Sequence, residues 1–422
     1  MRVSELLRDI PCACGKTHSC PIQAVCITPR AAEELAQICA PYQRILLVAD
    51  GNTWDAAGSA VEKALGAKVS GKVIFPAQPL LIPDEAAIET VNAALDGVDL
   101  LVAIGSGVLQ DLCKYVSFKA GISYAVMATA PSMDGYASDG AAMILGGMKV
   151  TVKSHLPIAI VADPRVLAAA PMDMIRAGAG DIIGKFSALN DWKLSRCING
   201  EYFCQFIYDL TYEQIQRVLD LTDDILERKA DAVGALMEAL VVVGIMMSFA
   251  GSSRPASGSE HHLSHFFEIT GIVHGTPYFP HGIDVAYATV ITAQVRQTLL
   301  QNDFPDHIFR LPRAELEAEM HRIYGSSADG CLALQDKVGN YDADRLNVFR
   351  EKEQEIRAIL AEMPAPEKIR DMLEHLGLPM QKFYDFYGED HIADAVLYAK
   401  DLKDRYTVLW LYYDFFGGKR HV

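Results

Sequence analysis

This 422-residue chain lacks long apolar runs and any sequence typical of export. Its longest apolar run, residues 239–250, is well short of the roughly 20 residues that a membrane-spanning helix needs, so it predicts a buried core helix. The first ten residues have neither the apolar segment nor the small-residue cleavage site of a secretory signal. We therefore expect a cytoplasmic protein that does not enter a membrane.

Clustered basic residues are also lacking. The chain has 38 Lys and Arg against 54 Asp and Glu, a formal net charge of −16. Binding to a phosphate backbone needs clustered Lys and Arg, so this balance argues against a nucleic-acid partner. Half of the residues are hydrophobic and 22% are charged, as in an ordinary globular protein. The length exceeds what one core usually organises, and it favours two domains.

Nine cysteines, an odd number, are spread along the chain, which favours reduced thiols over a disulfide framework. One cluster near the N-terminus contains Cys12, Cys14, His18 and Cys20, enough ligands for a tetrahedral zinc ion. The spacing is not one of the usual zinc patterns. It also fits an N-terminal hairpin with a glycine turn, followed by a strand at residues 23–27. A metal in this cluster would be structural.

The first part of the chain alternates between apolar strands and helices, a pattern typical of parallel β/α units. A doubly wound, Rossmann-like parallel sheet is expected here, followed from about residue 165 by an all-α domain with turn signals near Gly178 and Gly180. A ligand is expected in a cleft between domains 1–165 and 166–422. The expected strands are 44–50, 68–75, 98–104 and 123–129, and the expected helices are 56–65, 83–95, 108–120, 212–229, 314–324, 345–363 and 366–376.

Two features of the first domain indicate a nucleotide site. A strand runs into Gly105-Ser106-Gly107 and then into a helix, so backbone N–H groups and the positive helix end could meet a pyrophosphate. Such a turn without a third glycine also occurs as a plain strand-to-helix connection. Asp50, at the end of an earlier strand, has two readings: a carboxylate that binds a ribose hydroxyl, or an acid that starts a helix.

The loop after the next strand, residues 128–138, is rich in hydroxyl groups. Loops at the carboxyl ends of parallel strands carry ligand contacts. Thr129, Ser132 and Ser138 are therefore candidates for binding phosphate or the nicotinamide amide. Asp134 could hydrogen-bond a substrate hydroxyl, or it could form a turn with Gly135.

Four of the twelve histidines, His261, His262, His265 and His281, lie within residues 261–281. His261 and His265 are one helical turn apart, and His281 follows in a separate loop. Asp181, after Gly-Ala-Gly, could complete a metal site with two histidines and one open position, or it could be a first-turn acid of a helix. Helical histidine pairs are also common on solvated surfaces.

The ordered motifs resemble the sn-glycerol-1-phosphate dehydrogenase family, a branch of the iron-containing alcohol dehydrogenase, glycerol dehydrogenase and dehydroquinate synthase-like superfamily. The resemblance spans residues 44–287, and its most specific part is Ser-Arg-Pro-Ala-Ser-Gly-Ser-Glu-His at 253–261. The other matching motifs are Gly-Ser-Gly-x-x-x-Asp, Ala-Pro-Ser-x-Asp-Gly-x-x-Ser, Gly-Ala-Gly-Asp and Pro-His-Gly. The chain departs from the commoner Gly-Gly-Gly-x-x-x-Asp by having Ser106 in the middle.

The resemblance implies roles for individual residues. Asp181, His261 and His281 would hold a divalent metal, zinc or nickel, whereas His265, Asp134 and Asp181 would contact the substrate. Asp181 and His265 would be catalytic. His262, on the other helix face, would take no part. NAD(P) would contact the matching positions Gly107, Val108, Leu109, Gln110, Asp111, Thr129, Ala130, Pro131, Ser132 and Ser138, with Asp50 as the ribose candidate.

The implied reaction is the reversible, NAD(P)H-linked reduction of dihydroxyacetone phosphate to sn-glycerol 1-phosphate, a step of phospholipid biosynthesis. The metal would polarise the substrate carbonyl and stabilise the developing alkoxide. Lys185 and Arg254 are candidates, by location only, for binding the substrate phosphate. We also expect a homo-oligomer, a dimer or larger. The alternatives are a metal-dependent glycerol or polyol dehydrogenase of the same superfamily and a non-catalytic nucleotide- or metal-binding protein.

Overall fold

A computed structural model describes residues 2–146 and 148–419. It contains two compact units, and the division between them differs from the expected boundary at residue 165. The first unit consists of Met1–Ile182 and Glu213–Ser253, and the second of Ile183–Tyr212 and Arg254–Val422. The first unit therefore takes in helices from beyond the sheet in the sequence.

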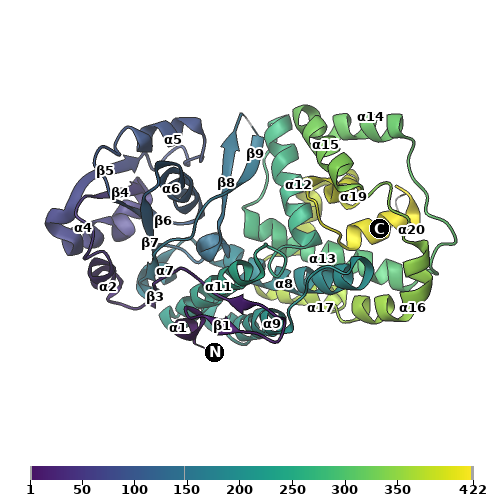
Figure 1. Ribbon diagram of the computed structural model, residues 1–422, viewed down its shortest axis with the longest axis horizontal. Helices are drawn as coiled ribbons and strands as arrows, with labels where there is room; N and C mark the ends of the chain where they lie inside the picture. The colour runs from purple at the N-terminus through teal and green to yellow at the C-terminus, as the bar shows by residue number, and fades with distance from the viewer. Residues whose placement is uncertain (1, 147, 420–422) are drawn as a thin grey trace. The chain divides into compact units, whose positions relative to one another are not determined.

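The first unit is built on a six-stranded sheet in which every neighbouring pair is parallel. The four expected strands and the strand expected at 23–27 are all present, which confirms the α/β prediction for this part of the chain (Figure 1). Sequence reasoning missed the last strand, β10, and a separate antiparallel hairpin, β8–β9. The sheet order is β3 (Ala24–Ile27), β10 (Ala159–Ala162), β7 (Ser123–Ala128), β6 (Leu100–Gly105), β4 (Ile45–Asp50) and β5 (Val69–Phe75), and the hairpin pairs Gly140–Leu145 with Met148–Lys153.

Helices cover both faces of this sheet, so its central strands are apolar on both sides. On one face, α2 (Ala31–Ile38) and α4 (Ser59–Leu65) share a buried core with alternate strand residues such as Leu47 and Val102. On the other face lies α6 (Gly107–Ala120), beside α5 (Glu85–Asn92). Burial on both faces explains why these strands appear in the sequence as continuous apolar runs.

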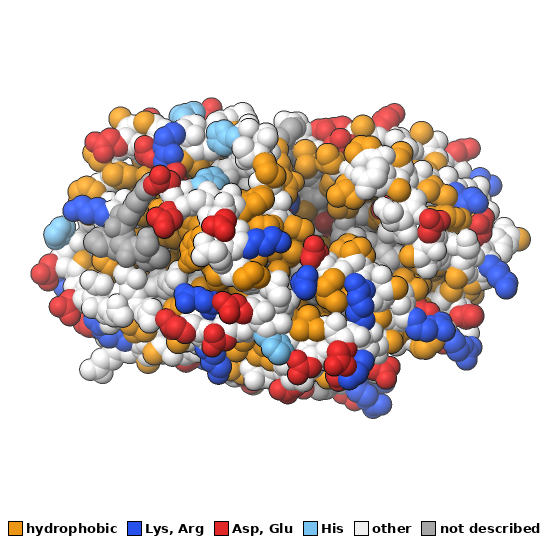
Figure 2. Space-filling model, turned by 180° about the vertical axis from the view of Figure 1, so that it is seen from behind, with side chains coloured by type: hydrophobic (Ala, Val, Ile, Leu, Met, Phe, Trp, Pro, Cys, Tyr) orange, Lys and Arg blue, Asp and Glu red, His pale blue; other side chains and the backbone are white. Residues whose placement is uncertain are grey.

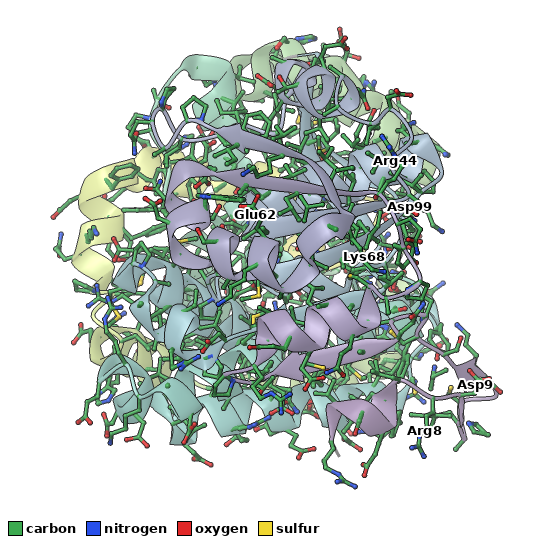
Figure 3. All side chains as sticks on the ribbon, turned by 90° about the vertical axis from the view of Figure 1, so that its left-hand side faces the viewer. Arg8, Asp9, Arg44, Glu62, Lys68 and Asp99 are labelled. Atoms are coloured by element: carbon green, nitrogen blue, oxygen red, sulfur yellow. The ribbon has the colours of Figure 1, made fainter. Side chains whose placement is uncertain are left out.

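Hydrogen bonds between side chains and the backbone link the starts of neighbouring strands. The carboxylate of Asp99, just before β6, accepts hydrogen bonds from the backbone N–H groups of Gln43 and Arg44 at 2.8 and 3.0 Å. The ammonium of Lys68 donates to the carbonyl of Tyr42 at 2.8 Å. Arg44, Asp99 and Lys68 lie on the same side of the unit in Figure 3. The bonds to Asp99 join the amino ends of β4 and β6, and the bond from Lys68 joins the start of β5 to the segment before β4.

The strand order reverses between β4 and β6. From β4 the chain continues to the outer strand β5, and it then crosses to β6 on the other side of β4. In open α/β sheets, ligands bind outside the carboxyl ends of the two strands at such a switch point. Here those ends are Asp50 and Gly105.

The helices beyond the sheet begin with α7 (Pro164–Ala169) and α8 (Met172–Asn199). Gly178 and Gly180 lie inside α8, so the turn predicted there is wrong; Gly178 allows a close approach to Pro131 and does not end the helix. α9 (Gln205–Asp220) and α10 (Thr222–Leu226) follow. α11 (Ala230–Ala250) is long and apolar enough to cross a membrane, but 83% of that stretch is buried in the protein, as predicted for a core helix.

Among its described residues, the second unit has only helices as regular elements. The expected helices at 314–324, 345–363 and 366–376 are present to within a few residues at either end. Figure 2 shows acidic and basic side chains interspersed on the face that it presents. The helices from α12 onward are α12 (Ser259–His274), α13 (His281–Leu300), α14 (Arg313–Tyr324), α15 (Ala328–Val338), α16 (Leu346–Ala361), α17 (Pro366–His375), α18 (Met380–Tyr387), α19 (Glu389–Tyr398) and α20 (Val408–Phe416).

Candidate functional site

The turn from β6 into α6 has the form expected of a phosphate-binding turn. β6 ends at Gly105, Ser106 is the N-cap residue, and α6 begins at Gly107 and runs for 14 residues. A Cβ at Gly107 would lie 2.9 Å from the sulfur of Met133, so only glycine fits there without a shift of that side chain. The N–H groups of the first helical turn remain at the positive end of the helix, which favours an anion.

The loop after β7 is tied to this turn. The backbone N–H of Thr129 donates to the carbonyl of Gly105 at 3.1 Å. The buried side chain of Gln110, on α6, donates to the carbonyls of Gly135 and Tyr136 at 3.2 and 2.8 Å. Gln110 is a predicted cofactor contact, and its side-chain amide anchors the loop that carries the hydroxyl groups.

A buried ion pair continues this anchoring. The ammonium of Lys114 lies 3.2 Å from the carboxylate of Asp111 and donates to the carbonyl of Gly140 at 2.7 Å. Burial raises the pKa of Asp111, although Lys114 opposes the shift. Asp111 was expected to contact the cofactor, and in the structure its carboxylate faces the cation beneath the turn.

The remaining cofactor candidates lie on the same two segments. Val108 is partly exposed in the first turn of α6, whereas the side chain of Leu109 is buried under Gly105. The hydroxyl of Ser138 donates to the carbonyl of Gly135 at 3.1 Å, and Ala130 accepts a bond from Tyr136 at 2.7 Å. The others, Pro131 and Ser132, belong to the loop between β7 and the short helical turn Gly135–Ala137.

Asp50 is a helix cap. Its carboxylate accepts a hydrogen bond from the backbone N–H of Thr53 at 2.9 Å, and the hydroxyl of Thr53 receives the N–H of Asp50 at 3.0 Å. This reciprocal pair satisfies two donors at the start of α3 (Gly51–Thr53). Asp50 therefore starts a helix, as one of the two hypotheses predicted. It lies at the strand end where a ribose ligand is also expected.

The two aspartates of the predicted substrate and metal site meet in the first unit. Asp181 is fully buried, and its carboxylate accepts a hydrogen bond from the backbone N–H of Asp134 at 3.0 Å. Asp181 lies in the interior of α8, so its alternative role as a first-turn acid is wrong. A Cβ at Gly178, one turn earlier, would lie 1.8 Å from the carbonyl oxygen of Pro131. Glycine at this position lets the helix reach the loop.

Three of the four clustered histidines converge in the second unit. His261 and His265 are one turn apart on α12, as predicted, and His281 is the first residue of α13 rather than a loop residue. The ring centroids of His261 and His265 lie 5.1 and 5.4 Å from that of His281, and 6.3 Å from each other. The imidazoles therefore share one small volume, as ligands and substrate contacts of one centre would.

Acidic and hydroxyl groups stand behind these rings. The Nδ1 atom of His261 lies 2.7 Å from the carboxylate of Glu260. The Nδ1 atom of His281 lies 3.2 Å from the hydroxyl of Ser264 and 3.4 Å from the carboxylate of Glu268. A carboxylate accepts the Nδ1 proton and leaves the Nε2 lone pair for a metal, the arrangement usual behind metal-binding histidines. The donor chemistry thus fits a divalent metal.

Sequence reasoning missed Glu260 and Glu268. Both are buried, and burial raises the pKa of Glu260 against the opposing bond from the N–H of Gly258. Glu260 precedes a proposed ligand, and Glu268 follows His265 by one helical turn. A search for carboxylates one turn from each histidine on α12 would have found Glu268.

Three other candidates turn inward. His262 is fully buried, and desolvation lowers its pKa well below the ordinary value, in keeping with a histidine that takes no part in catalysis. The ammonium of Lys185 is buried and donates to the carbonyl of Ala256 at 2.9 Å. Arg254 is paired with the carboxylate of Glu201 at 2.6 Å. Both cations are used inside the second unit, which removes the argument for them as phosphate ligands.

Known proteins are similar in sequence to this chain over most of its length. A glycerol-1-phosphate dehydrogenase [NAD(P)+] of Bacillus licheniformis is 30% identical over 94% of this chain and 90% of its own. One from Bacillus subtilis is 33% identical over 71% of this chain and 80% of its own. The chain belongs to the glycerol-1-phosphate dehydrogenase family. Residues 26–171 also match the model of the iron-containing alcohol dehydrogenase family.

Solved structures agree on the fold. A maleylacetate reductase of Agrobacterium tumefaciens superposes with a TM-score of 0.63 at 13% identity, covering 97% of this chain and 99% of its own. A putative alcohol dehydrogenase of Ralstonia eutropha gives a TM-score of 0.62 at 14% identity, with 94% and 95% covered. At these identities the likeness concerns the fold alone. It confirms the predicted iron-containing alcohol dehydrogenase fold.

Proposed function

We propose that the protein catalyses the reversible, NAD(P)H-linked reduction of dihydroxyacetone phosphate to sn-glycerol 1-phosphate with the help of a divalent metal. Relatives that carry the name glycerol-1-phosphate dehydrogenase match the chain over most of its length. The observation that carries the proposal is the convergence of His261, His265 and His281 in front of two buried carboxylates. His261 is buried and the other two rings are partly exposed, so the group combines a fixed ligand with access for a metal and a substrate.

Asp181, His261 and His281 are the proposed metal ligands, and zinc or nickel is the proposed ion. Two imidazole nitrogens and one carboxylate oxygen leave a position for a substrate oxygen, as in other catalytic metal sites. This assignment is supported by the tautomer that Glu260 imposes on His261. The carboxylate of Asp181, which is buried, would add the anionic oxygen ligand of such a site.

A metal held by Asp181, His261 and His281 would polarise the substrate carbonyl, and a bound nicotinamide would supply the hydride. The residues of the chain bind and orient the reacting groups. We assign His265 and Asp134 to the hydroxyl of the substrate, with Asp181 against it. Glu260 and Glu268 are positioning residues, because each acts through a histidine. The cofactor is assigned to the turn at Gly107, which follows β6 at the switch point of the sheet, and to the loop from Thr129 to Ser138, which follows the neighbouring strand β7.

The substrate assignment is tested by comparing two ketones that differ only in the phosphate. NADH or NADPH oxidation is measured with dihydroxyacetone phosphate and with dihydroxyacetone. We expect kcat/KM to be at least about tenfold higher for the phosphate ester, since a bound phosphate contributes charge-assisted hydrogen bonds. The opposite order would assign the protein to the dehydrogenases of free polyols.

The metal assignment is tested by removing and restoring the ion. Dialysis against a chelator is expected to abolish turnover, and addition of Zn²⁺ or Ni²⁺ to restore it. His261→Ala and His281→Ala should each lose the metal, whereas His307→Ala, at an exposed histidine, should keep it. Full activity in metal-free protein would refute the metal assignment. We also infer that the protein forms a homo-oligomer in the cytoplasm. Light scattering on the purified protein measures its oligomeric state.

A further inference from the structure

The structure brings sulfur and nitrogen ligands together near the N-terminus, apart from the histidine centre. β1 (Ile10–Pro11) and β2 (Thr17–His18) pair as a short antiparallel hairpin. The ligating atoms of Cys12, Cys14 and His18 all lie within 4.8 Å of one another. Cys20, which the spacing in the sequence had placed with them, is not a member of this group.

The turn between the two strands explains how the sulfurs meet. The N–H of Cys12 donates to the carbonyl of Lys16, and the N–H of Gly15 donates to the carbonyl of Cys12, both at 3.0 Å. Gly15 has a φ of +87°, a conformation that glycine adopts without strain. The turn thus brings the two cysteines, separated by one residue, to the same end of the hairpin as His18.

His18 is held in the tautomer that binds a metal through Nε2. It is 1% exposed, and its ring stacks on Phe249 with a centroid distance of 5.2 Å. Its Nδ1 atom lies 3.2 Å from the carbonyl oxygen of Phe249, which can only accept, so Nδ1 carries the proton. The Nε2 lone pair is then directed at Cys14, whose sulfur lies 3.5 Å away. A backbone carbonyl behind the ring is usual for metal-binding histidines.

The one separation that joins a sulfur to a nitrogen in this group matches zinc. With Zn–S near 2.3 Å and Zn–N near 2.05 Å, two ligands of a tetrahedral ion are about 3.6 Å apart. The separation between Cys14 and His18 is 3.5 Å. The hairpin itself has only two residues in each strand, fewer than an isolated hairpin needs for stability in water. A metal would supply the missing constraint.

We propose that Cys12, Cys14 and His18 are three ligands of a structural Zn²⁺ site, separate in composition from the histidine centre of the proposed reaction. Thiolate and neutral imidazole are the ligands that zinc prefers in structural sites. A tetrahedral ion takes one further ligand besides these three. The site does not depend on the proposed function, because it shares none of its residues.

The test uses the full-length protein, purified under reducing conditions and reconstituted with Co²⁺. Thiolate ligands give tetrahedral cobalt a charge-transfer band in the near ultraviolet, which imidazole and carboxylate ligands do not give. We expect this band in the wild-type protein and in His261→Ala. We expect the band to be lost in Cys12→Ser and Cys14→Ser and to be retained in Cys20→Ser. Among these three variants, the amount of tightly bound zinc per chain should fall where the band is lost and stay where it is retained.

Two results would overturn the proposal. One is a wild-type protein that takes up cobalt without a thiolate band. That result would mean that the Cys14 thiol and His18 contact each other without binding a metal. The other is loss of the band in Cys20→Ser with retention in Cys14→Ser. Circular dichroism checks that each variant is folded. For a variant that does not fold, the wild-type protein provides the second measurement: a thiol-selective reagent should react with Cys12 and Cys14 only after a chelator has removed the zinc.

Discussion

The carboxylate of Asp181 and the backbone N–H of Asp134 are joined by a hydrogen bond of 3.0 Å. One residue comes from the interior of a long helix, and the other from the loop that follows β7. This bond fixes the loop of the predicted substrate contact to the helix of the predicted metal ligand. One oxygen of Asp181 thus has a structural role in addition to the role proposed for it at the metal.

The variant Asp181→Asn separates these two roles. The amide oxygen can still accept the bond from Asp134, so the stability of the fold should change little. The anionic ligand is lost, and we expect kcat/KM to fall by at least about 100-fold, the upper end of the loss seen when a residue behind a metal ligand is changed. Metal content and steady-state rates measure the effect. A variant with full metal content and full activity would contradict the ligand assignment.

Gly178 offers a test of the packing that positions Asp181. A Cβ at this residue would lie 1.8 Å from the carbonyl oxygen of Pro131, so Gly178→Ala must push the helix and the loop apart. We expect a loss of about 1–3 kcal/mol in unfolding free energy. Gly330→Ala is the matched control, because a Cβ there meets nothing within 4 Å. In helix α15 this control should raise stability by up to about 1 kcal/mol, and equal effects of the two variants would refute the packing argument.

Periodicity and residue type were sufficient to predict the central strands β4, β6 and β7, because each is buried on both faces and therefore continuous in apolar residues. The pairing of His261 and His265 was predictable for a similar reason, since a helical turn brings them together. The position of Asp181 was not. Glycines near it look like a turn in the sequence, and only the close approach to Pro131 shows why they lie in a helix.

Contacts between distant segments also could not be predicted from the sequence. Gln110 and Asp111 occupy the positions of a cofactor motif, yet their side chains face the carbonyls of the next loop and the ammonium of Lys114. Lys185 and Arg254 are cations near the motifs, but each is engaged by an acceptor inside the fold. Which partner a buried polar group finds depends on tertiary packing, which local patterns do not record.

Two substitutions distinguish the two hypotheses for Asp50, a helix cap and a ribose contact. Asn is as good a helix cap as Asp, so Asp50→Asn should keep the bond to Thr53 and the stability, whereas Asp50→Ala should lose about 1 kcal/mol. If the carboxylate also binds the ribose, both variants should raise the KM for NADH. An unchanged KM in Asp50→Asn would leave Asp50 with the capping role alone. Urea denaturation and initial rates measure the two effects.

Glu260 is expected to tune the metal through His261. Glu260→Gln retains an oxygen that can accept the Nδ1 proton at the observed distance of 2.7 Å but removes the charge that makes the imidazole more basic. We expect metal affinity to fall by about 10- to 100-fold, with activity restored by excess metal. Competition with a chelator measures the affinity. Unchanged affinity would show that the contact with Glu260 only packs the ring.

His155 predicts a pH dependence of stability. Its ring stacks on Tyr124 and lies 2.8 Å from the hydroxyl of Ser117; burial lowers its pKa, and Lys114 lowers it further. Below the unfolded pKa of about 6.5, the unfolded chain binds a proton that the folded chain resists. The contribution of His155 is therefore fully present above that pH and is lost as the pH falls toward the folded pKa.

His155→Gln keeps a polar partner for Ser117 and cannot titrate. Between pH 6.5 and 5, the unfolding free energy of the wild-type protein should therefore fall more steeply than that of the variant. The difference should remain below the limit of about 1.4 kcal/mol per pH unit for one proton. Urea denaturation at several pH values gives both curves. Parallel curves would mean that His155 titrates alike in the folded and unfolded chains, against the effect of its burial between Tyr124 and Ser117.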